Sequence, residues 1–390
     1  MSTPSLDIVC VGFSDWNNEL LTNEKHLLAR LAPRHRILYV ESLGLRRPQL
    51  GSGKDLRRIG RRLVRGVAPP KLEDGVHVLS PLVLPVHHHP AAVRLNRAIL
   101  PRLVRAGVRR AGMRDPLLWS FVPQAEVLID ALRPRRVLYY IDDDHGAKNG
   151  IDADAFGAAE RRFAPRADVI MASAPELVER MRRLNDHVVY APNVTDTALF
   201  ATALQTGPVD PAIAALARPV VVFIGGLNAS TIDLDLTLAL ARARPDWSFA
   251  FVGPVGPGDP GTDISPLRTA PNVHLLGPRP YEQLPLVLRG AAAAIVPYHT
   301  GGAMRSVFPM KTYEYLAAGL PVVTTPLAAL RDVPEVIVAP DAAAMAARLD
   351  EVMRTDTPQL RAERSRAVRG HSWEARAAQI EELLAPPAEG

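Results

Sequence analysis

Short apolar runs of strand length alternate with helical segments along most of the 390-residue chain. The first run, LDIVCVGF at 6–13, is apolar on both of its alternating faces. A strand of this kind is buried on both sides, which is typical of a parallel sheet covered by helices. Further strands of the same series are expected at 36–42, 117–122, 136–142, 168–174 and 187–193. Strands that alternate with helices in this way predict an α/β fold.

A second series follows a break at 201–219 that is rich in Ala and Pro. Its strands are expected at 219–227, 247–254, 272–278, 292–298, 321–325 and 335–340. The chain is also too long for one typical core. We therefore expect two doubly wound, Rossmann-like parallel-sheet domains, residues 1–200 and residues 201–370. A C-terminal helix at about 371–386 should pack back on the first domain.

The net charge of +5 is divided unevenly between the halves of the chain. Residues 1–195 carry 30 Lys and Arg against 21 Asp and Glu, whereas residues 196–390 carry 16 against 20. The most basic stretch, 46–65, has eight Arg and Lys, one acid, and apolar residues at helical spacing. A basic amphipathic helix favours an anionic membrane surface, with a solvated helix face as the alternative. No aromatic residues interleave with the basic ones, so nucleic acid is not expected as a partner.

Several classes of protein are disfavoured by what the chain lacks. Its one cysteine, Cys10, excludes a disulfide framework and a Cys-rich metal site. The three histidines at 87–89 are flanked by prolines and are expected in a loop rather than at a metal. Neither a signal peptide nor an apolar run of membrane-spanning length is visible. We expect a cytoplasmic protein, either soluble or peripheral at the inner face of the membrane.

Three glycines stand where a parallel sheet places its ligands. In doubly wound sheets, ligands bind beyond the carboxyl ends of the strands, where backbone must come close. Gly225, Gly226 and Gly253 each follow an expected strand. They do not form a G-x-G-x-x-G fingerprint that opens a helix, and no G-x-x-x-x-G-K-[ST] occurs. These absences disfavour a dinucleotide site and a P-loop ATPase.

The stretch VFPMKTYEYLAAGLPVV at 307–323 places two charges among apolar residues. We expect a helix that starts near Pro309 and stops before Gly319. Lys311 and Glu314 then lie one turn apart on one face, close to a helix N-terminus that favours a phosphate. The lysine suits a phosphate, and the glutamate can accept hydrogen bonds from two vicinal ribose hydroxyls. The pair predicts nucleotide binding, with a surface ion pair as the alternative.

The pattern P-x-K-x-x-E-Y-L-A-A-G-x-P-V-V resembles the donor-nucleotide motif of GT-B glycosyltransferases. FIGGL, FVGP, NVHLLGPRPYEQLP and AAIVPY precede it in the order of that family. The first half, with SDW, TNEKHLLARLA, YYIDDD and YAPNVTDTALF, resembles a bacterial subgroup related to teichuronic-acid-type and xanthan-type enzymes. The resemblance implies a GT-B fold, with two domains facing a central cleft. It also implies transfer of a sugar from a nucleotide-diphosphate sugar, of UDP or GDP type, to a hydroxyl acceptor.

The resemblance assigns residues on the donor side. Glu314 would hold the ribose. Lys311 would face the diphosphate with the backbone of the strand-end glycines. Arg279 would lie by the base, and Arg305 is a further candidate for the phosphates or the sugar. The family often has a second Glu eight positions before the first, where this chain has Ser306, and often a cation after the Gly-Gly turn, where 227–231 has none. No metal and no cofactor are implied.

The acceptor side is expected on the first domain. Asp142, Asp143, Asp144 and His145 follow an expected strand directly. If the transfer inverts configuration, Asp143 or Asp144 is the candidate general base, whereas in a retaining transfer these acids would only position the acceptor. Ser14, Asp15 and Trp16 of the SDW loop, with His145, are the candidate acceptor-binding residues. The alternatives are a solvated acidic loop for the first group and a turn with one packed Trp for the second.

The predicted product is a cell-surface polysaccharide, a glycolipid or a secondary metabolite. Two other functions remain open on the sequence. One is a UDP-sugar 2-epimerase of the same fold. The other is a non-catalytic scaffold that binds a nucleotide or sugar, for which Ser306 and the missing cation at 227–231 leave room.

Overall fold

The computed structural model describes residues 5–17, 22–43, 69–83, 90–148, 150–257, 259 and 261–385. The chain divides into two compact units. Unit 1 comprises Met1–Pro192 together with Trp373–Gly390, and unit 2 comprises Asn193–Ser372. The basic segment 46–65 and the histidines at 87–89 lie outside the described residues. Among the helices that are described, none is long and apolar enough to cross a membrane.

The described part of unit 1 is built on one eight-stranded sheet with the order β3-β4-β2-β1-β5-β6-β7-β8. Its strands are β1 Asp7–Val11, β2 Arg36–Val40, β3 Lys71–Glu73, β4 Val76–Leu79, β5 Leu117–Ser120, β6 Val137–Ile141, β7 Val169–Ala172 and β8 Val188–Tyr190. All neighbours pair in parallel except β3, which is antiparallel to β4. The chain runs outward from β1 to one side and then returns to β5 on the other. The carboxyl ends of β1 and β5 are therefore the switch point, where ligands bind in such sheets.

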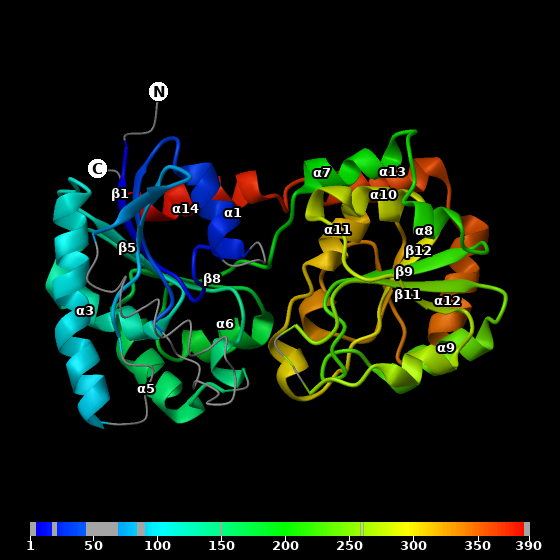
Figure 1. The fold of residues 1–390 in the computed structure, drawn as a ribbon, viewed down its shortest axis with the longest axis horizontal. Coiled ribbons are helices and arrows are strands. Elements are labelled where there is room, and N and C mark those ends of the chain that lie inside the picture. Colours follow the sequence, from blue (N-terminus) through cyan, green and yellow to red (C-terminus); the bar gives the residue numbers. More distant parts are fainter. Residues whose placement is uncertain are drawn as a thin grey trace. The chain divides into compact units, whose positions relative to one another are not determined.

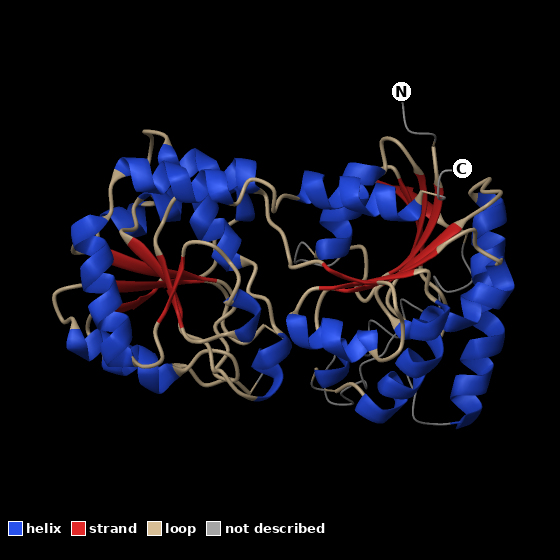
Figure 2. Cartoon of the chain, turned by 180° about the vertical axis from the view of Figure 1, so that it is seen from behind, coloured by secondary structure: helices blue, strands red, loops and turns tan. Residues whose placement is uncertain are grey.

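Helices cover both faces of this sheet, as Figure 2 shows. They are α1 Asn23–Leu31, α3 Pro90–Arg110, α4 Val127–Leu132, α5 Ala153–Phe163, α6 Pro175–Arg182 and α14 Trp373–Leu384, with short turns η1 Pro123–Glu126, η2 His145–Ala147 and η3 Ala164–Arg166. Their starts follow from local chemistry. Thr22 caps α1 by accepting from the Lys25 N–H, and Asp152 caps α5 in the same way.

The helix α14 completes unit 1 although it comes last in the sequence. Figure 1 shows it, in red, beside the blue helix α1. The His26 ring stacks on Trp373 with the centroids 4.6 Å apart. The guanidinium of Arg376 donates to the Tyr140 hydroxyl and to the carbonyl oxygen of Pro192, the latter at 2.7 Å. A buried guanidinium that is satisfied in this way fixes the helix in register on the sheet.

Unit 2 contains a six-stranded, entirely parallel sheet with the order β11-β10-β9-β12-β13-β14 among the described residues. Its strands are β9 Val220–Ile224, β10 Ser248–Val252, β11 Val273–Leu275, β12 Ala293–Val296, β13 Val322–Thr324 and β14 Val336–Val338. Its helices are α7 Thr197–Ala201, α8 Pro211–Ala214, α9 Leu234–Ala243, α10 Leu284–Arg289, α11 Lys311–Ala317, α12 Ala342–Thr355 and α13 Pro358–Ala367. The short turns are η4 Thr202–Leu204, η5 Ser265–Thr269, η6 Tyr281–Gln283, η7 Gly302–Ser306 and η8 Ala328–Leu330. The switch point of this unit lies at the carboxyl ends of β9 and β12.

Two local features differ from the sequence-based expectation. The helix expected from Pro309 begins at Lys311, so that the lysine is its first residue. The hairpin β3–β4 was not predicted, although its loop is Asp74-Gly75 with φ angles of 51° and 80°. An Asp-Gly pair with two positive φ angles is the preferred two-residue hairpin loop. The flanking strands are only three and four residues long, which hid their alternation.

Candidate functional site

Glycine backbone forms the carboxyl edge of β9, β10 and β11 in unit 2. The N–H of Gly225 donates to the carbonyl of Val252 at 2.9 Å, and the N–H of Gly253 donates to the carbonyl of Gly277 at 3.0 Å. Gly225 has φ +134°, a conformation that glycine adopts most readily. A Cβ at Gly253 would overlap the carbonyl oxygen of Gly225. Close backbone packing thus requires glycine at these positions, and the strand ends there carry no side chains.

The amine of Lys311 lies over this strand edge, beside Gly225. Its Nζ donates to the Tyr298 hydroxyl and stands 4.4 Å from the centroid of the Phe223 ring. A Cβ placed on Gly225 would meet the same Nζ at 2.7 Å. In the described part of the chain, Lys311 forms no salt bridge with a carboxylate. The structure therefore brings together two of the predicted donor residues, Lys311 and Gly225.

Glu314 is buried one turn further along α11, with 7% of its surface exposed. Burial raises the pKa of its carboxyl to about 7, although the Lys311 charge and a hydrogen bond from Thr195 act in the opposite direction. The hydroxyl of Thr195 also lies 3.2 Å from that of Tyr281. A buried glutamate outside any salt bridge with Lys311 does not fit the alternative of a surface ion pair. Sequence reasoning missed Thr195, Tyr281 and Tyr298, because they come from separate segments.

The remaining predicted donor residues have different environments. The Nε of Arg279 donates to Asp210 at 2.7 Å, and its NH1 donates to the carbonyl of Leu276 at 2.8 Å. This guanidinium is therefore turned toward the fold and holds the loop after β11. Arg305 is exposed in η7, and Gly226 packs on the Pro257 ring.

In unit 1, Asp142 and His145 form a pair at the carboxyl end of β6. The His145 Nε2 lies 2.9 Å from Oδ1 of Asp142, and the Asn23 amide donates to Oδ2 at 2.9 Å. Burial alone would raise the pKa of Asp142, but the hydrogen bond and charge of His145 hold it below its ordinary value. The imidazole stacks on Phe13 with the centroids 3.9 Å apart. Its Nδ1 is buried and has no hydrogen-bond partner among the described residues.

The two acids predicted as the general base are paired with cations. Lys148 lies 2.9 Å from Oδ2 of Asp143, whose Oδ1 accepts from the N–H of Asp144. Arg180 donates to Asp144 at 3.0 Å. The structure therefore separates the acidic run into two ion-paired acids and one acid that orients a histidine.

The SDW loop contributes mainly backbone and packing. The Tyr39 hydroxyl donates to the carbonyl of Ser14 at 2.7 Å, and the N–H of Trp16 donates to Glu41 at 2.8 Å. The indole is 2% exposed and lies 5.3 Å from the Tyr39 ring. Asp15 is half-buried in the same loop. This geometry is that of the alternative, a turn with one packed Trp.

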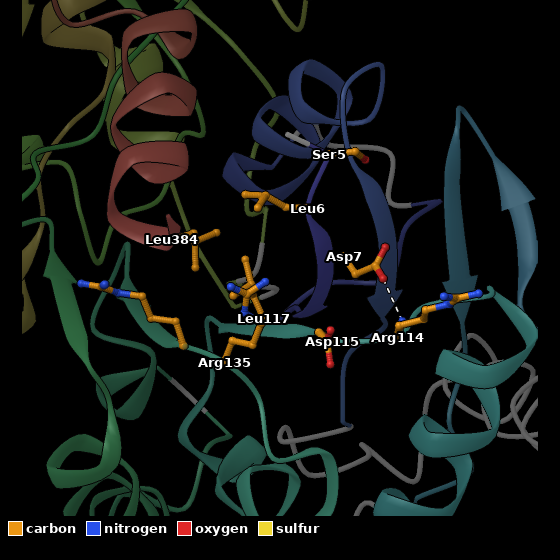
Figure 3. A pocket seen from close by; sticks show the side chains of 9 residues that line it. Ser5, Leu6, Asp7, Arg114, Asp115, Leu117, Arg135 and Leu384 are labelled. Carbon is orange, nitrogen blue, oxygen red and sulfur yellow. Dashed lines mark hydrogen bonds between the residues drawn. The ribbon is translucent and has the colours of Figure 1, made fainter. Parts of the chain in front are cut away.

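A cavity of about 160 Å³ lies at the other edge of the unit 1 sheet, at the amino ends of β1 and β5. Figure 3 shows Asp7 directed toward Arg114, whose backbone N–H donates to it at 2.8 Å. Ligands of doubly wound sheets bind at the carboxyl edge, so we assign this cavity no part in the site. Within the described ranges, no group of three or more His, Cys, Asp or Glu side chains is arranged to hold a metal ion.

Comparison with known proteins places the donor residues in a known domain. Residues 218–355 match the family described as glycosyl transferases group 1. The matched segment lies within unit 2 and includes Gly225, Lys311 and Glu314. It also carries Arg279 and Arg305, so every predicted donor residue belongs to it.

One curated relative extends the likeness by sequence. The putative teichuronic acid biosynthesis glycosyltransferase TuaH of Bacillus subtilis (strain 168) is 31% identical over 175 residues. The matched segment is 44% of this chain and 43% of that relative, so less than half of the relative's length is matched. This match agrees with the teichuronic-acid-type resemblance noted in the sequence.

Solved structures extend the likeness by fold. Sucrose-phosphate synthase from Thermosynechococcus elongatus has a TM-score of 0.67 at 16% identity, over 97% of this chain and 98% of that one. Anabaena HepE in complex with UDP and glucose has a TM-score of 0.63 at 15% identity, over 96% of this chain and 98% of that one. The E. coli trehalose-6-phosphate protein bound with UDP-2-fluoro glucose has a TM-score of 0.67 at 12% identity, over 97% of this chain and 99% of that one. These likenesses confirm the predicted fold class, GT-B with two parallel-sheet domains.

Proposed function

We propose that the protein is a glycosyltransferase that moves a sugar from a nucleotide-diphosphate sugar to a hydroxyl acceptor. The observation that carries this proposal is the meeting of Lys311, Gly225 and Glu314 at the switch point of unit 2. A cation, a bare strand end and a buried carboxylate are the groups that a diphosphate and a ribose require. That all three lie in a group 1 glycosyl transferase domain supports the proposal.

On the donor side, Glu314 accepts hydrogen bonds from the ribose diol, and Lys311 faces the diphosphate. Hydrogen bonds to charged groups contribute about 1.5–3 kcal/mol each, so both side chains matter to affinity. The exposed Arg305 is a second cation for the phosphates or the sugar. The loop that Arg279 holds would meet the base through its backbone, with the Gly226 and Gly253 turns beside the phosphates. We propose that these protein cations stabilise the leaving diphosphate without a metal ion or cofactor.

The nucleobase of the donor is proposed from the structural neighbours. HepE is bound with UDP and glucose, and the E. coli protein with UDP-2-fluoro glucose. UDP is therefore the first nucleotide to test on this chain, and GDP is the second.

The acceptor side is proposed to be the loop 142–145 of unit 1, together with Ser14 and Asp15 of the SDW loop. An inverting transfer needs a base for the acceptor proton, whereas a retaining transfer does not. Asp143 and Asp144 were the bases expected from the sequence, but both are ion-paired. His145 is oriented by Asp142, and its Nδ1 has no hydrogen-bond partner among the described residues, so we propose it as a further candidate for the base.

The biological setting is proposed from the sequence and from one relative. Likeness to a putative teichuronic acid biosynthesis glycosyltransferase supports a cell-surface polysaccharide or a lipid-linked precursor as the acceptor. The basic segment 46–65 supports a site of action at the inner face of a membrane. Sedimentation with anionic vesicles at low and high salt tests this. Equal binding after neutralisation of 46–65 would contradict it.

A nucleotide screen tests the proposed function. The protein is heated with UDP, GDP, dTDP or ADP, and one of them should raise the melting temperature, because a ligand at 100 times its Kd stabilises by about 2.7 kcal/mol. Glu314→Gln should abolish that shift, whereas Glu351→Gln, an exposed change on α12, should keep it. The sugar nucleotide that carries the same base should then be hydrolysed slowly in the absence of acceptor, with release of its nucleoside diphosphate. Tight binding without any turnover would favour the scaffold, and conversion of the sugar without release would favour the epimerase.

A further inference from the structure

The amine of Lys311 is held by two aromatic residues from different strands of unit 2. Its Nζ lies 4.4 Å from the ring centroid of Phe223 in β9 and 4.8 Å from that of Tyr298, which follows β12. Both distances are within the range of a cation–π interaction. The Nζ also donates to the Tyr298 hydroxyl, and because an ammonium group has no acceptor, the direction of this hydrogen bond is fixed.

The two rings are themselves held by the core of the unit. Phe223 is completely buried, and its ring lies 5.5 Å from that of Phe251 in the neighbouring strand β10. Tyr298 has 6% of its surface exposed. Its carbonyl accepts from the Thr325 hydroxyl at 2.7 Å, and it forms an isolated antiparallel bridge with Ile232. The place of the amine is therefore set by the sheet as well as by α11.

This arrangement favours a cation that is in place before a ligand arrives. A lysine side chain has many rotamers, and ordering it during binding would cost free energy. Here the two rings and the hydroxyl order it in the folded protein. The rings carry no net charge, so they hold the cation without neutralising it. The amine stays at the carboxyl end of β9, because a Cβ on Gly225 would lie only 2.7 Å from it.

We propose that Tyr298 is a positioning residue for donor binding, which together with the ring of Phe223 holds the Lys311 amine ready for the diphosphate of the sugar nucleotide. This inference rests on the proposed function. Tyr298 acts through Lys311 rather than through the base or the ribose. Its removal should therefore affect only ligands that carry the diphosphate, and only while the amine is present.

The experiment measures the binding of UDP and of uridine by calorimetry, or of GDP and guanosine if GDP is the preferred nucleotide. Tyr298→Phe keeps the ring and removes the hydroxyl, and Phe223→Leu removes one aromatic face and keeps an apolar side chain. We expect Tyr298→Phe to bind the diphosphate about three- to tenfold more weakly and the nucleoside with unchanged affinity. Phe223→Leu should weaken the diphosphate in the same direction, by about threefold.

Two matched variants control for the loss of the same groups elsewhere. Tyr190→Phe removes an exposed tyrosine hydroxyl in unit 1, and Phe249→Leu changes a buried phenylalanine in β10. Phe249→Leu should lower the melting temperature as a large-to-small change in a core does. Both controls should bind UDP and uridine as the wild type does.

A double-mutant cycle separates positioning from packing. In a Lys311→Gln background, Tyr298→Phe should cause no further loss of UDP affinity, because the group on which it acts is gone. A loss of the same size in both backgrounds would overturn the inference, as would an equal loss for UDP and uridine. Tighter UDP binding by Tyr298→Phe would also overturn it, since the hydroxyl would then hold the amine away from the phosphates.

The proposed function and this inference fail in different ways. A wild type that binds neither UDP nor GDP would overturn the proposed function itself. Binding that depends on Lys311 but is unaltered in Tyr298→Phe would overturn only the positioning role of the tyrosine.

Discussion

The amine of Lys311 fills the space that the absent side chain of Gly225 leaves. A Cβ built on Gly225 would lie 2.7 Å from Nζ and 2.9 Å from Cε of the lysine. The two residues are 86 positions apart in the sequence, and they meet because α11 begins over the carboxyl end of β9. Glycine at 225 and lysine at 311 are thus one structural pair.

Gly225→Ala should displace Lys311 and weaken nucleotide-diphosphate binding by about tenfold or more. The change also strains a backbone at φ +134°, at a cost of about 1–3 kcal/mol of folding free energy. Gly370→Ala is the matched control, because a Cβ there meets nothing within 4 Å. Calorimetry with UDP and thermal unfolding measure the two effects. If Gly225→Ala retains the affinity of the wild type, the pairing has no functional role.

Lys311→Gln should weaken the binding of UDP but leave that of uridine unchanged. The lysine faces the diphosphate, and a hydrogen bond to a charged group contributes about 1.5–3 kcal/mol, or about ten- to a hundredfold in affinity. The comparison of UDP with uridine isolates the phosphates, and the exposed Lys71→Gln is the control. Equal losses for both ligands would place Lys311 elsewhere than at the diphosphate.

Glu314→Gln should change how the stability of the protein depends on pH. The pKa of Glu314 is raised from 4.5 to about 7 in the folded state, so the native protein holds this proton more tightly than the unfolded chain. The stabilisation is fully present below pH 4.5 and is lost as the pH rises through 7. The loss is on the order of 3 kcal/mol at about 1.4 kcal/mol per pKa unit. Glu314→Gln lacks it, so its melting temperature should gain on the wild type between pH 5 and pH 8. Parallel curves would contradict the assigned pKa.

His145→Gln should lower turnover about 10²- to 10⁴-fold, the usual contribution of general acid–base catalysis, and leave UDP affinity unchanged. Asp143→Asn should cost much less, because its carboxylate is paired with Lys148. Asp142→Asn should lower turnover by misorienting the imidazole. Release of UDP in the presence of acceptor measures all three. A larger loss in Asp143→Asn than in His145→Gln would restore Asp143 as the base.

Much of the fold could be predicted because its signals are local. Strands such as β9 and β10 are continuous apolar runs that only a doubly covered parallel sheet accommodates. The hairpin β3–β4 was missed because its strands are short and its outer strand is exposed. The start of α11 was misplaced by two residues, because proline before a helix can stand inside or just outside its first turn.

The site could be predicted where its residues share one segment. Lys311 and Glu314 lie one turn apart on α11, and their spacing is visible in the sequence. Thr195 and Tyr281, whose hydroxyls lie 3.2 Å apart, come from segments far away in the chain, with no spacing that marks them. The acidic run at 142–144 shows the same limit. Which acid is ion-paired depends on Arg180 and Lys148, and no sequence pattern reports that choice.

The placement of α14 in unit 1 has a consequence for biosynthesis. Unit 1 needs Trp373, Arg376 and Ile380 to close its core, yet these residues are synthesised after the whole of unit 2. Domains generally fold as units while the ribosome elongates the chain, N-terminal first. Here that order is reversed: the second half of the nascent chain can mature first, and the first half must wait for the last helix to leave the ribosome.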